Sequence, residues 1–234
     1  TGIGADGRLC QVAYKFEGEE KMALFKPPVP IEIEAMSVTH ITNKMVADKE
    51  PFIDSAMRRD LEKIFSAENI MVAHNAQFDA EILKKENLKI GQMIDTLKIA
   101  HHLDVDSALG RHNLQYLRYF FDLEVEDATA HDALGDIRVL EKLFDYFFEK
   151  MMVEHGDEKR VLEEMLEISK RPIMIKKFNF GKYNGELVSE VAKKDANYLS
   201  WLFNQKVMAR ENGLENDENW IYTLDKHLNS GKLL

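Results

Sequence analysis

Residues 131–136 read H-D-A-L-G-D, and residues 74–79 read H-N-A-Q-F-D. Each stretch ends on an aspartate that follows a histidine by five residues, and apolar runs flank both stretches. Hydrolysis of a phosphodiester needs such side chains, because carboxylates hold divalent metal ions and a histidine can deprotonate the attacking water. The two stretches are therefore the candidate catalytic motifs of the chain.

The positions of these aspartates agree with that interpretation. Asn75 is placed to cap a helix that runs to about Lys85, so Asp79 falls in the first turn beside the end of a strand. Ligands of open α/β sheets usually lie at that edge. Taken alone, Asp79 is typical of a residue that complements the helix dipole, and His131 and Asp136 are typical of a cap and a surface carboxylate. The occurrence of both motifs in this order favours the catalytic alternative.

The surrounding pattern predicts an α/β sheet domain over residues 1–155. A hairpin is expected from two strands, 8–16 and 21–26, and a helix is expected to begin at Pro51. Short strands and helices then alternate up to a long helical pattern from 131 to about 153. Residues 156–171 are predicted to form a helical linker, and the aromatic-rich residues 172–234 a second, small domain.

Composition limits the class of protein. The chain has 234 residues, of which 45% are hydrophobic and 31% charged, as expected for a globular protein. No apolar stretch reaches the roughly 20 residues of a membrane span, so no membrane partner is expected. Cys10 is the only cysteine, which excludes an intrachain disulfide and favours the cytoplasm. The net charge of −10 argues against a passive nucleic-acid coat, although residues 171–234 carry ten basic and eight acidic side chains.

Together, H-N-A-x-F-D and H-x-A-x-x-D resemble the second and third motifs of the DnaQ-like 3′→5′ exonucleases of the DEDDh type. Residues 1–14 resemble the end of that family's first motif, D-x-E-T-T-G, and the strand that follows it. Residues 35–49 and 178–203 are similar, more narrowly, to the exodeoxyribonuclease X branch of the family. The resemblance implies an RNase H-like mixed β-sheet flanked by helices, followed by a small C-terminal α+β domain.

The resemblance also implies roles for single residues. Asp79 and Asp136 would be metal ligands, and His131 would be the general base. Hard oxygen ligands select Mg²⁺ or Mn²⁺, and two such ions roughly 4 Å apart can stabilise both the attacking and the leaving oxygen. The residues implied to lie near the terminal nucleotide are Phe78, His74, Val38 and Thr39. Phe78 could stack on a base or pack in the core.

The second domain offers candidate DNA contacts. Lys176, Lys177 and Lys182 are expected to contact the phosphate backbone. The aromatic side chains either serve as stacking platforms or form a small core, and we expect most of them to be core. A run of histidines and aspartates suggests a further metal cluster, but such runs are more often solvated helix ends: His101, His102, Asp104 and Asp106.

Two departures from the family pattern stand out. Related enzymes read V-H-G-I-T in the substrate loop, whereas residues 38–42 read V-T-H-I-T, so His40 contacts the nucleotide or merely covers the loop. The aspartate and glutamate of the first motif should stand just before Thr1. We therefore expect further residues ahead of Thr1, with the first strand, and an inactive or crippled enzyme without them.

The leading hypothesis is a metal-dependent 3′→5′ exodeoxyribonuclease that releases nucleoside monophosphates from DNA 3′ ends, in DNA repair. Polymerase proofreading and RNA trimming are alternatives on the same catalytic domain. A non-catalytic nucleic-acid-binding module is the alternative from another class, and it holds if the natural protein lacks the carboxylates of the first motif.

Overall fold

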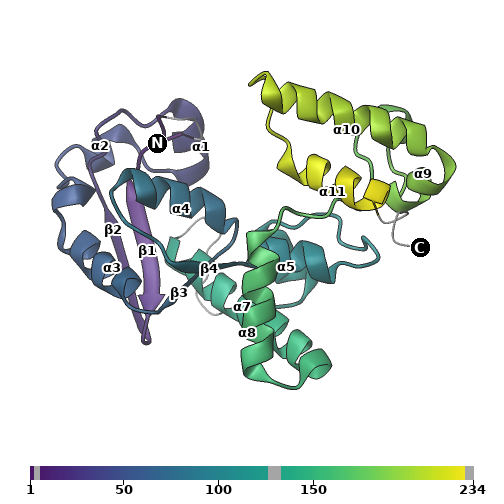
Figure 1. Cartoon of the computed structure of the whole chain (residues 1–234). Coiled ribbons are helices and arrows are strands. Elements are labelled where there is room, and N and C mark those ends of the chain that lie inside the picture. The colour runs from purple at the N-terminus through teal and green to yellow at the C-terminus, as the bar shows by residue number, and fades with distance from the viewer. Residues whose placement is uncertain (3–5, 126–132, 230–234) are drawn as a thin grey trace. The chain divides into compact units, whose positions relative to one another are not determined.

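The computed structural model of the protein describes residues 1–2, 6–125 and 133–229 (Figure 1). The chain divides into two compact units. The first comprises Thr1–Leu97 and Arg111–Ser169, and the second comprises Lys98–Gly110 and Lys170–Leu234. A segment from the middle of the chain thus belongs with the C-terminal residues. Among the described residues, none of the helices has the length and apolar character that crossing a membrane requires.

A β-hairpin opens the first unit. Strands β1 (Gln11–Phe16) and β2 (Glu19–Leu24) pair antiparallel. Glu17 and Gly18 form the turn between them with positive φ angles of 50° and 83°. Two successive positive φ angles are the mark of a type I′ turn, whose twist matches that of the strands it joins. The predicted hairpin is confirmed.

A second strand pair is parallel. Strands β3 (Ile70–Ala73) and β4 (Gln92–Asp95) lie side by side in register, and α4 (Ala76–Lys85) connects them. Parallel strands need such a crossover, because a tight turn can only reverse the chain. Within the described residues the two strand pairs form separate two-stranded sheets. Helices pack against both pairs, so the predicted α/β class is confirmed.

Helix α3 (Ala56–Ser66) begins later than the predicted start at Pro51, which opens only a 3₁₀ turn, η1 (Phe52–Asp54). Ser55 sets the start, because its Oγ accepts a hydrogen bond from the Arg58 N–H at 3.1 Å. On one face of the hairpin, α3 contributes to an apolar cluster. Its buried members are Leu9, Phe25, Phe52, Leu61 and Leu88.

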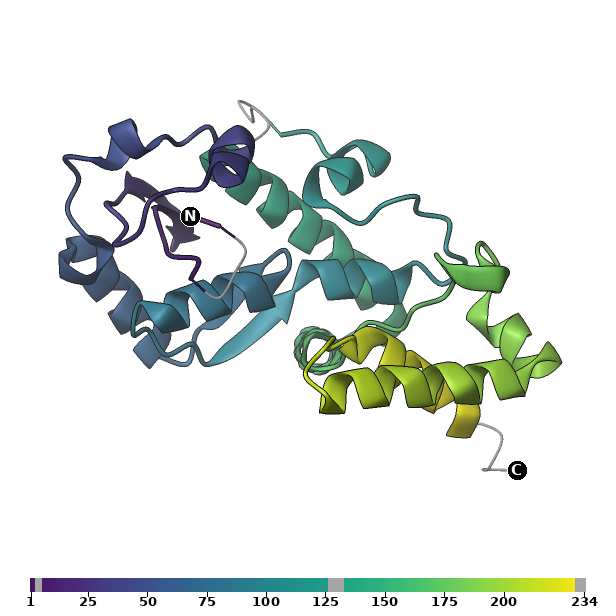
Figure 2. The same ribbon diagram turned by 90° about the horizontal axis from the view of Figure 1, so that it is seen from above.

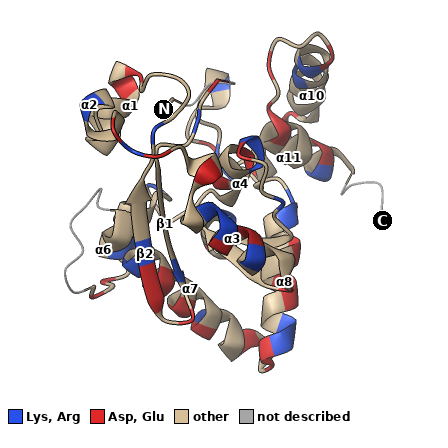
Figure 3. Cartoon of the chain, turned by 90° about the vertical axis from the view of Figure 1, so that its left-hand side faces the viewer, with Lys and Arg blue, Asp and Glu red and all other residues tan. Residues whose placement is uncertain are grey.

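The residues predicted to link two domains form helix α8 (Glu158–Lys170). This helix buries an apolar face that includes Val161 and Met165, and it belongs to the first unit through Ser169. Acidic and basic residues are interspersed along α3 and α8 (Figure 3). The other helices with residues in the first unit are α1 (Ile33–Thr39), α2 (Asn43–Val46), α5 (Thr96–Leu103), α6 (Leu114–Phe120) and α7 (Ala133–His155).

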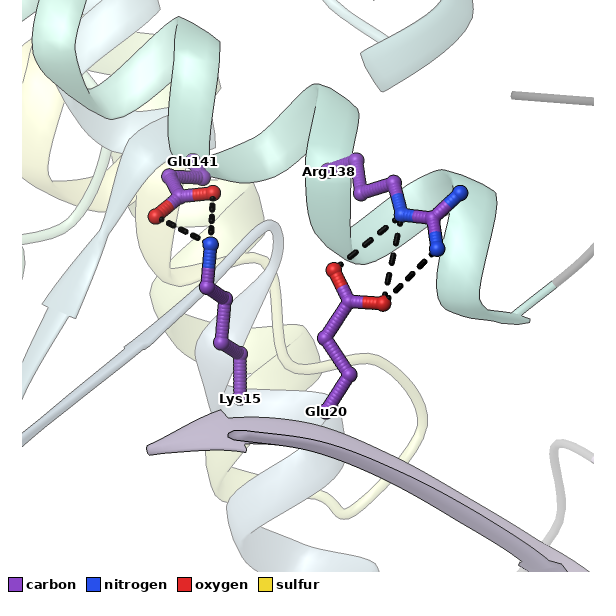
Figure 4. Close-up of polar contacts among 4 residues, drawn as sticks. All are labelled: Lys15, Glu20, Arg138 and Glu141. Atoms are coloured by element: carbon purple, nitrogen blue, oxygen red, sulfur yellow. Dashed lines mark hydrogen bonds and ion pairs between the residues drawn. The ribbon is translucent and has the colours of Figure 1, made fainter. Parts of the chain in front are cut away.

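Two ion pairs join α7 to the hairpin (Figure 4). Lys15 Nζ lies 2.6 Å from Glu141 Oε2, and Arg138 Nη2 lies 2.8 Å from Glu20 Oε2. Lys15 and Glu20 are opposite each other in the strand register, so they point to the same face of the hairpin. Partly exposed pairs contribute little stability individually. Their effect is to fix the register of α7 against this face, the one opposite the α3 cluster.

The second unit is mainly helical. It contains a 3₁₀ turn, η2 (Gly181–Tyr183), and helices α9 (Val188–Lys194), α10 (Ala196–Glu211) and α11 (Glu218–Asn229). Figures 1 and 2 show α10 and α11 side by side. The expectation of an aromatic core is confirmed by the buried rings of Phe178 and Trp220. The buried core residues are Phe178, Val188, Val191, Leu199, Leu202, Trp220 and Leu224.

Asp195 caps α10 at the centre of a polar cluster. Its Oδ1 accepts the Tyr198 N–H at 3.1 Å, and its Oδ2 accepts the Tyr183 hydroxyl at 2.6 Å and Lys182 Nζ at 2.9 Å. These hydrogen bonds, that of Tyr183 first and that of Lys182 second, lower the pKa of Asp195 to about 2. The carboxylate form is therefore the one that the folded unit favours.

We expect Asp195→Asn to lower the melting temperature at pH 7 and to have a much smaller effect near pH 2. A carboxyl whose pKa is lowered on folding stabilises the protein above its unfolded pKa of about 3.8. That contribution is lost as the pH falls through the folded value. Thermal unfolding followed by circular dichroism between pH 7 and pH 2 measures the difference. Glu211→Gln, at the exposed end of the same helix, is the control, and a pH-independent difference for Asp195→Asn would contradict the assignment.

Candidate active site

The turn between β3 and α4 positions Asp79. Asn75 occupies the N-cap position and Asp79 lies in the first turn of the helix, as the sequence predicts. The predicted cap by the Asn75 side chain is wrong, because that side chain makes no capping hydrogen bond. Asn75 instead adopts the left-handed conformation, with φ at 69°, and its backbone N–H donates to Asp95 Oδ1 at 3.0 Å.

Asp95 is a buried carboxylate that organises this turn. Its side chain is 2% exposed, and its Oδ1 accepts the N–H groups of Asn75 and Leu97, both at 3.0 Å. The Asp95 N–H donates to Ser169 Oγ on α8 at 2.8 Å. One residue thus joins the end of β4, the turn before α4 and helix α8. Asp95 therefore serves as supporting structure for this turn.

The Asp79 carboxyl lies in an unfavourable place for a negative charge. Asp79 retains exposed surface, yet the protein atoms around it displace much of the water that would solvate the carboxylate. This desolvation is the main cause of a pKa raised to about 6, and the negative charge of Asp95 contributes in the same direction. A bound cation would favour the carboxylate form and oppose both effects.

His74 uses both of its ring nitrogens within the protein. Nε2 lies 2.8 Å from the His112 carbonyl oxygen, which can only accept, so Nε2 carries a proton. Nδ1 lies 2.9 Å from Thr96 Oγ1. Burial lowers the pKa of His74, which favours a neutral ring. With its proton on Nε2, that ring offers Nδ1 as an acceptor to the Thr96 hydroxyl, which also lies 3.3 Å from the Ala73 carbonyl oxygen. The predicted contact between His74 and the terminal nucleotide stays a prediction, and the structure gives this residue a positioning role.

Asp136 lies in the first turn of α7, where Gln115 Nε2 donates to its Oδ1 at 2.6 Å. The other end of that amide, Gln115 Oε1, is buried and has no hydrogen-bond partner among the described residues. The motif analysis missed Gln115. The one sequence feature that could have indicated Gln115 is its polar side chain within the otherwise apolar stretch 114–117, L-Q-Y-L.

Residues 112–115 link the two motifs. The His112 carbonyl oxygen binds His74 of the first stretch, and Gln115 binds Asp136 of the second. Asn113 between them caps α6, because its Oδ1 accepts the Tyr116 N–H at 2.9 Å. The structure therefore connects the motifs within the first unit through a capped helix start that is distant from both in sequence.

His131, the predicted general base, lies outside the described residues, which resume at Ala133 as α7 begins. An offset of five residues would not place His131 and Asp136 on one face of a helix. The catalytic role of His131 stays a prediction.

The other predicted nucleotide contacts, Val38, Thr39 and Phe78, are exposed. Val38 on α1 is 61% exposed and Phe78 on α4 is 42% exposed. Phe78 is therefore exposed in this structure rather than packed in the core. The Thr39 hydroxyl donates to the Ala35 carbonyl oxygen one turn back, at 2.8 Å, so its proton is committed to the helix.

Two of the predicted DNA-binding lysines are attached to the backbone of their own unit. Lys176 Nζ donates to the carbonyl oxygens of His101, at 2.9 Å, and of Asp104. Burial lowers the pKa of Lys176. Lys177 Nζ donates to the Ser107 carbonyl oxygen at 3.3 Å. Both lysines thus fasten the loop after α5 to the C-terminal residues.

Lys182, the third of these lysines, forms the ion pair with Asp195 at 2.9 Å. All three lysines lie in the second unit, whereas Asp79 and Asp136 lie in the first. The structure does not bring the lysines and the carboxylates together within one unit. Contact between these lysines and DNA stays a prediction.

The donor atoms at the site suit a hard divalent cation. Asp79 and Asp136 offer carboxylate oxygens, and the unpartnered Gln115 oxygen adds a neutral one beside Asp136. Two carboxylates form only part of a ligand set, and the described ranges contain no group of three or more His, Cys, Asp or Glu that could hold a metal. The suggested second cluster of His101, His102, Asp104 and Asp106 is therefore not such a group.

Comparison with known proteins identifies the family. The family model described as "Exonuclease" matches residues 9–144, more than half of the chain. The chain belongs to this exonuclease family. The model described as "Exodeoxyribonuclease X-like C-terminal" matches residues 178–207. The first match contains both catalytic motifs, and the second lies within the second unit.

Individual relatives agree with the family. Exodeoxyribonuclease 10 of Escherichia coli strain K12 is 34% identical over 181 residues, which cover 77% of this chain and 75% of that protein. The PolC-type DNA polymerase III of Caldanaerobacter subterraneus is 32% identical over 130 residues, 53% of this chain and 9% of the polymerase. The solved structure of exonuclease X with 5′ overhanging duplex DNA matches 71% of this chain and 94% of its own, with 26% identity and a TM-score of 0.53.

The family confirms the predicted fold and reaction class. The first unit has the RNase H-like fold of these exonucleases, and the protein is a phosphodiester hydrolase of a generally divalent-metal-dependent family. The resemblance inferred from residues 74–79 and 131–136 is therefore confirmed, and so is the exodeoxyribonuclease X-like character of the C-terminal residues.

We expect Asp95→Ala to lower the free energy of unfolding by about 2–5 kcal/mol, because two N–H groups lose their acceptor and each unmet buried donor costs about 1–3 kcal/mol. Asp95→Asn keeps an acceptor oxygen and should lose less than half as much. Urea denaturation followed by circular dichroism measures both. An Asp95→Ala protein within 0.5 kcal/mol of wild type, a change of about the usual surface size, would show that this carboxylate does not hold the turn.

Proposed function

We propose that the protein is a divalent-metal-dependent 3′→5′ exodeoxyribonuclease that releases nucleoside monophosphates from DNA 3′ ends. The observation that carries the proposal is the location of Asp79 and Asp136 in first helical turns of the exonuclease unit, linked through residues 112–115. The desolvated Asp79 carboxyl supports a cation at this place. The presence of an exodeoxyribonuclease X-like C-terminal element favours this activity over polymerase proofreading.

Each residue of the proposed site has its own role in the reaction. Asp79 and Asp136 would hold Mg²⁺ or Mn²⁺, with two ions in the complete protein. Bound divalent ions supply Lewis-acid activation of the phosphate and stabilise the attacking and leaving oxygens. His131 takes a proton from the attacking water at a ring nitrogen. Gln115 orients the Asp136 carboxylate, and His74 positions the turn that presents Asp79.

Exposed side chains near the motifs are the proposed contacts with the substrate. Phe78 and Val38 present apolar surface to the terminal nucleotide, and a ring can stack on any base, which suits an enzyme without sequence preference. Contact of Thr39 with the nucleotide would use a hydroxyl lone pair. DNA phosphates at Lys176, Lys177 or Lys182 would compete with the carbonyl and carboxylate partners of these side chains. We assign the enzyme to DNA repair. We place it in the cytoplasm, because a single cysteine cannot form an intrachain disulfide and is typical of a reducing compartment.

Asp136→Asn and Asp79→Asn are each expected to reduce Mg²⁺-dependent exonuclease activity of the full-length protein by more than tenfold, with the fold intact. Loss of a ligand charge weakens metal binding and misplaces the water, which raises the barrier by several kcal/mol. Release of nucleotides from a 3′-labelled oligonucleotide measures the rate, and circular dichroism tests the fold.

Glu149→Gln is the matched control, since it removes an exposed carboxylate from the same helix as Asp136. It should act like wild type. More than a tenth of wild-type activity at saturating Mg²⁺ in an aspartate variant would remove that aspartate from the site.

His131→Ala should lower the turnover rate by about 10²- to 10⁴-fold, the usual contribution of a general base, while the affinity for DNA changes little. The acid limb of the pH–rate profile, which reports protonation of that base, should disappear as well. Single-turnover cleavage measured from pH 5 to pH 9 tests both effects. An unchanged acid limb would mean that another group accepts the proton.

A further inference from the structure

Trp201 exposes a large ring on the surface of the second unit. Its side chain is 54% exposed, whereas the other tryptophan, Trp220, is 4% exposed and lies in the core. Among the described aromatic rings of phenylalanine, tyrosine and tryptophan in this unit, Trp201 alone falls in the exposed class. The small core therefore leaves one ring available to a partner.

A row of tyrosines fixes the position of this ring. Trp201 lies 5.6 Å from Tyr198 between ring centroids, with an interplanar angle of 34°, and Tyr198 lies 5.0 Å from Tyr183. Both tyrosines also contact buried Phe178, at 5.9 and 6.0 Å. The row thus runs from the core to the surface. A ring held in this way loses little conformational freedom when a flat ligand stacks on it.

Ammonium groups lie over the same row. Lys182 Nζ is 4.6 Å from the Tyr183 ring centroid and 4.8 Å from that of Tyr198, and Lys194 Nζ is 4.7 Å from that of Tyr183. Each lysine also has an acidic partner, Asp195 or Glu186. Two cations are therefore held beside the rings in an otherwise acidic protein.

The helix surface around Trp201 carries no negative charge. Residues 196–205 read A-N-Y-L-S-W-L-F-N-Q and contain no acidic side chain, although the chain has 41 of them. The exposed neighbours of Trp201 on α10 are instead amides and a hydroxyl, Asn197, Ser200, Asn204 and Gln205. Residues 196–205 themselves add no repulsion toward an anionic polymer, and the Asp195 carboxylate at the cap of this helix is paired with Lys182. The amides can form hydrogen bonds with bases.

We propose that Trp201 and Tyr198 form a stacking platform for the bases of single-stranded DNA, with Lys182 and Lys194 beside its phosphates. Stacked rings beside cations are the means by which proteins bind single strands without sequence preference. Duplex DNA hides its base faces, so a single-stranded segment is the fitting ligand. This inference rests on the proposed function for the identity of the polymer, and it assigns the second unit a substrate-holding role of its own.

The test is the affinity of the full-length protein for fluorescein-labelled oligo(dT), measured by anisotropy in EDTA so that the strand is not cleaved. Trp201→Ala should weaken binding by about 5- to 150-fold, the range reported for one stacked base. Trp201→Phe keeps a ring and should stay within about threefold of wild type. Met208→Ala is the control, because Met208 lies on the same helix and is also 54% exposed.

Intrinsic fluorescence gives a second readout, because the chain contains only two tryptophans. Unlabelled oligo(dT) should quench the emission of wild type. It should leave Trp201→Phe unquenched, since the remaining Trp220 is buried. A blunt duplex of the same length should quench wild type little. Quenching that persists in Trp201→Phe would place the strand elsewhere.

Other outcomes would overturn the proposal. Wild-type affinity in Trp201→Ala would remove the platform, and an equal loss of oligo(dT) affinity in Met208→Ala would show that the loss does not come from stacking on the Trp201 ring. A dimer that sedimentation shows to dissociate in Trp201→Ala, with no change in oligo(dT) binding, would make Trp201 a contact between copies. Failure of the proposed function is distinct, because it appears as absent Mg²⁺-dependent cleavage while oligo(dT) binding through Trp201 persists.

Discussion

The buried carboxylate of Asp95 is the constraint on which the catalytic unit depends. Burial of a charged group is costly unless hydrogen bonds replace its lost water, and here the N–H groups of Asn75 and Leu97 do so. The first of these bonds holds Asn75 in the left-handed conformation that turns the chain from β3 into α4. The direction of α4, and with it the position of Asp79, follows from this one contact.

The Asp95 carboxylate also affects the ionisation of Asp79, a predicted metal ligand. Its charge contributes to the raised pKa of Asp79, after desolvation, so the turn that presents the Asp79 carboxyl also makes its ionisation unfavourable. A divalent cation at the site would relieve that conflict. Unfavourable ionisation of this kind is expected where groups are arranged for function rather than for stability.

The sequence predicted those parts that depend on neighbouring residues. The turn at Glu17 and Gly18, the strand before His74 and the place of Asp79 in its helix follow from local spacing and from the backbone freedom of glycine. The amide of Gln115 could not be predicted, because its contact with Asp136 joins segments that no periodicity connects. The anchoring of Lys176 was hidden for the same reason, since the carbonyl groups that it binds lie far away in the sequence.

The aromatic residues of the second unit show the limit of composition as a guide. A unit this small must bury rings to hold together, and Phe178 and Trp220 meet that need. Helix α10 turns Leu199 and Leu202 inward, and the helical repeat then directs Trp201 outward. A ring on that face adds nothing to the core and exposes apolar surface to water. Its position at the end of a row of tyrosines that two lysines overlie is better explained by a ligand than by folding.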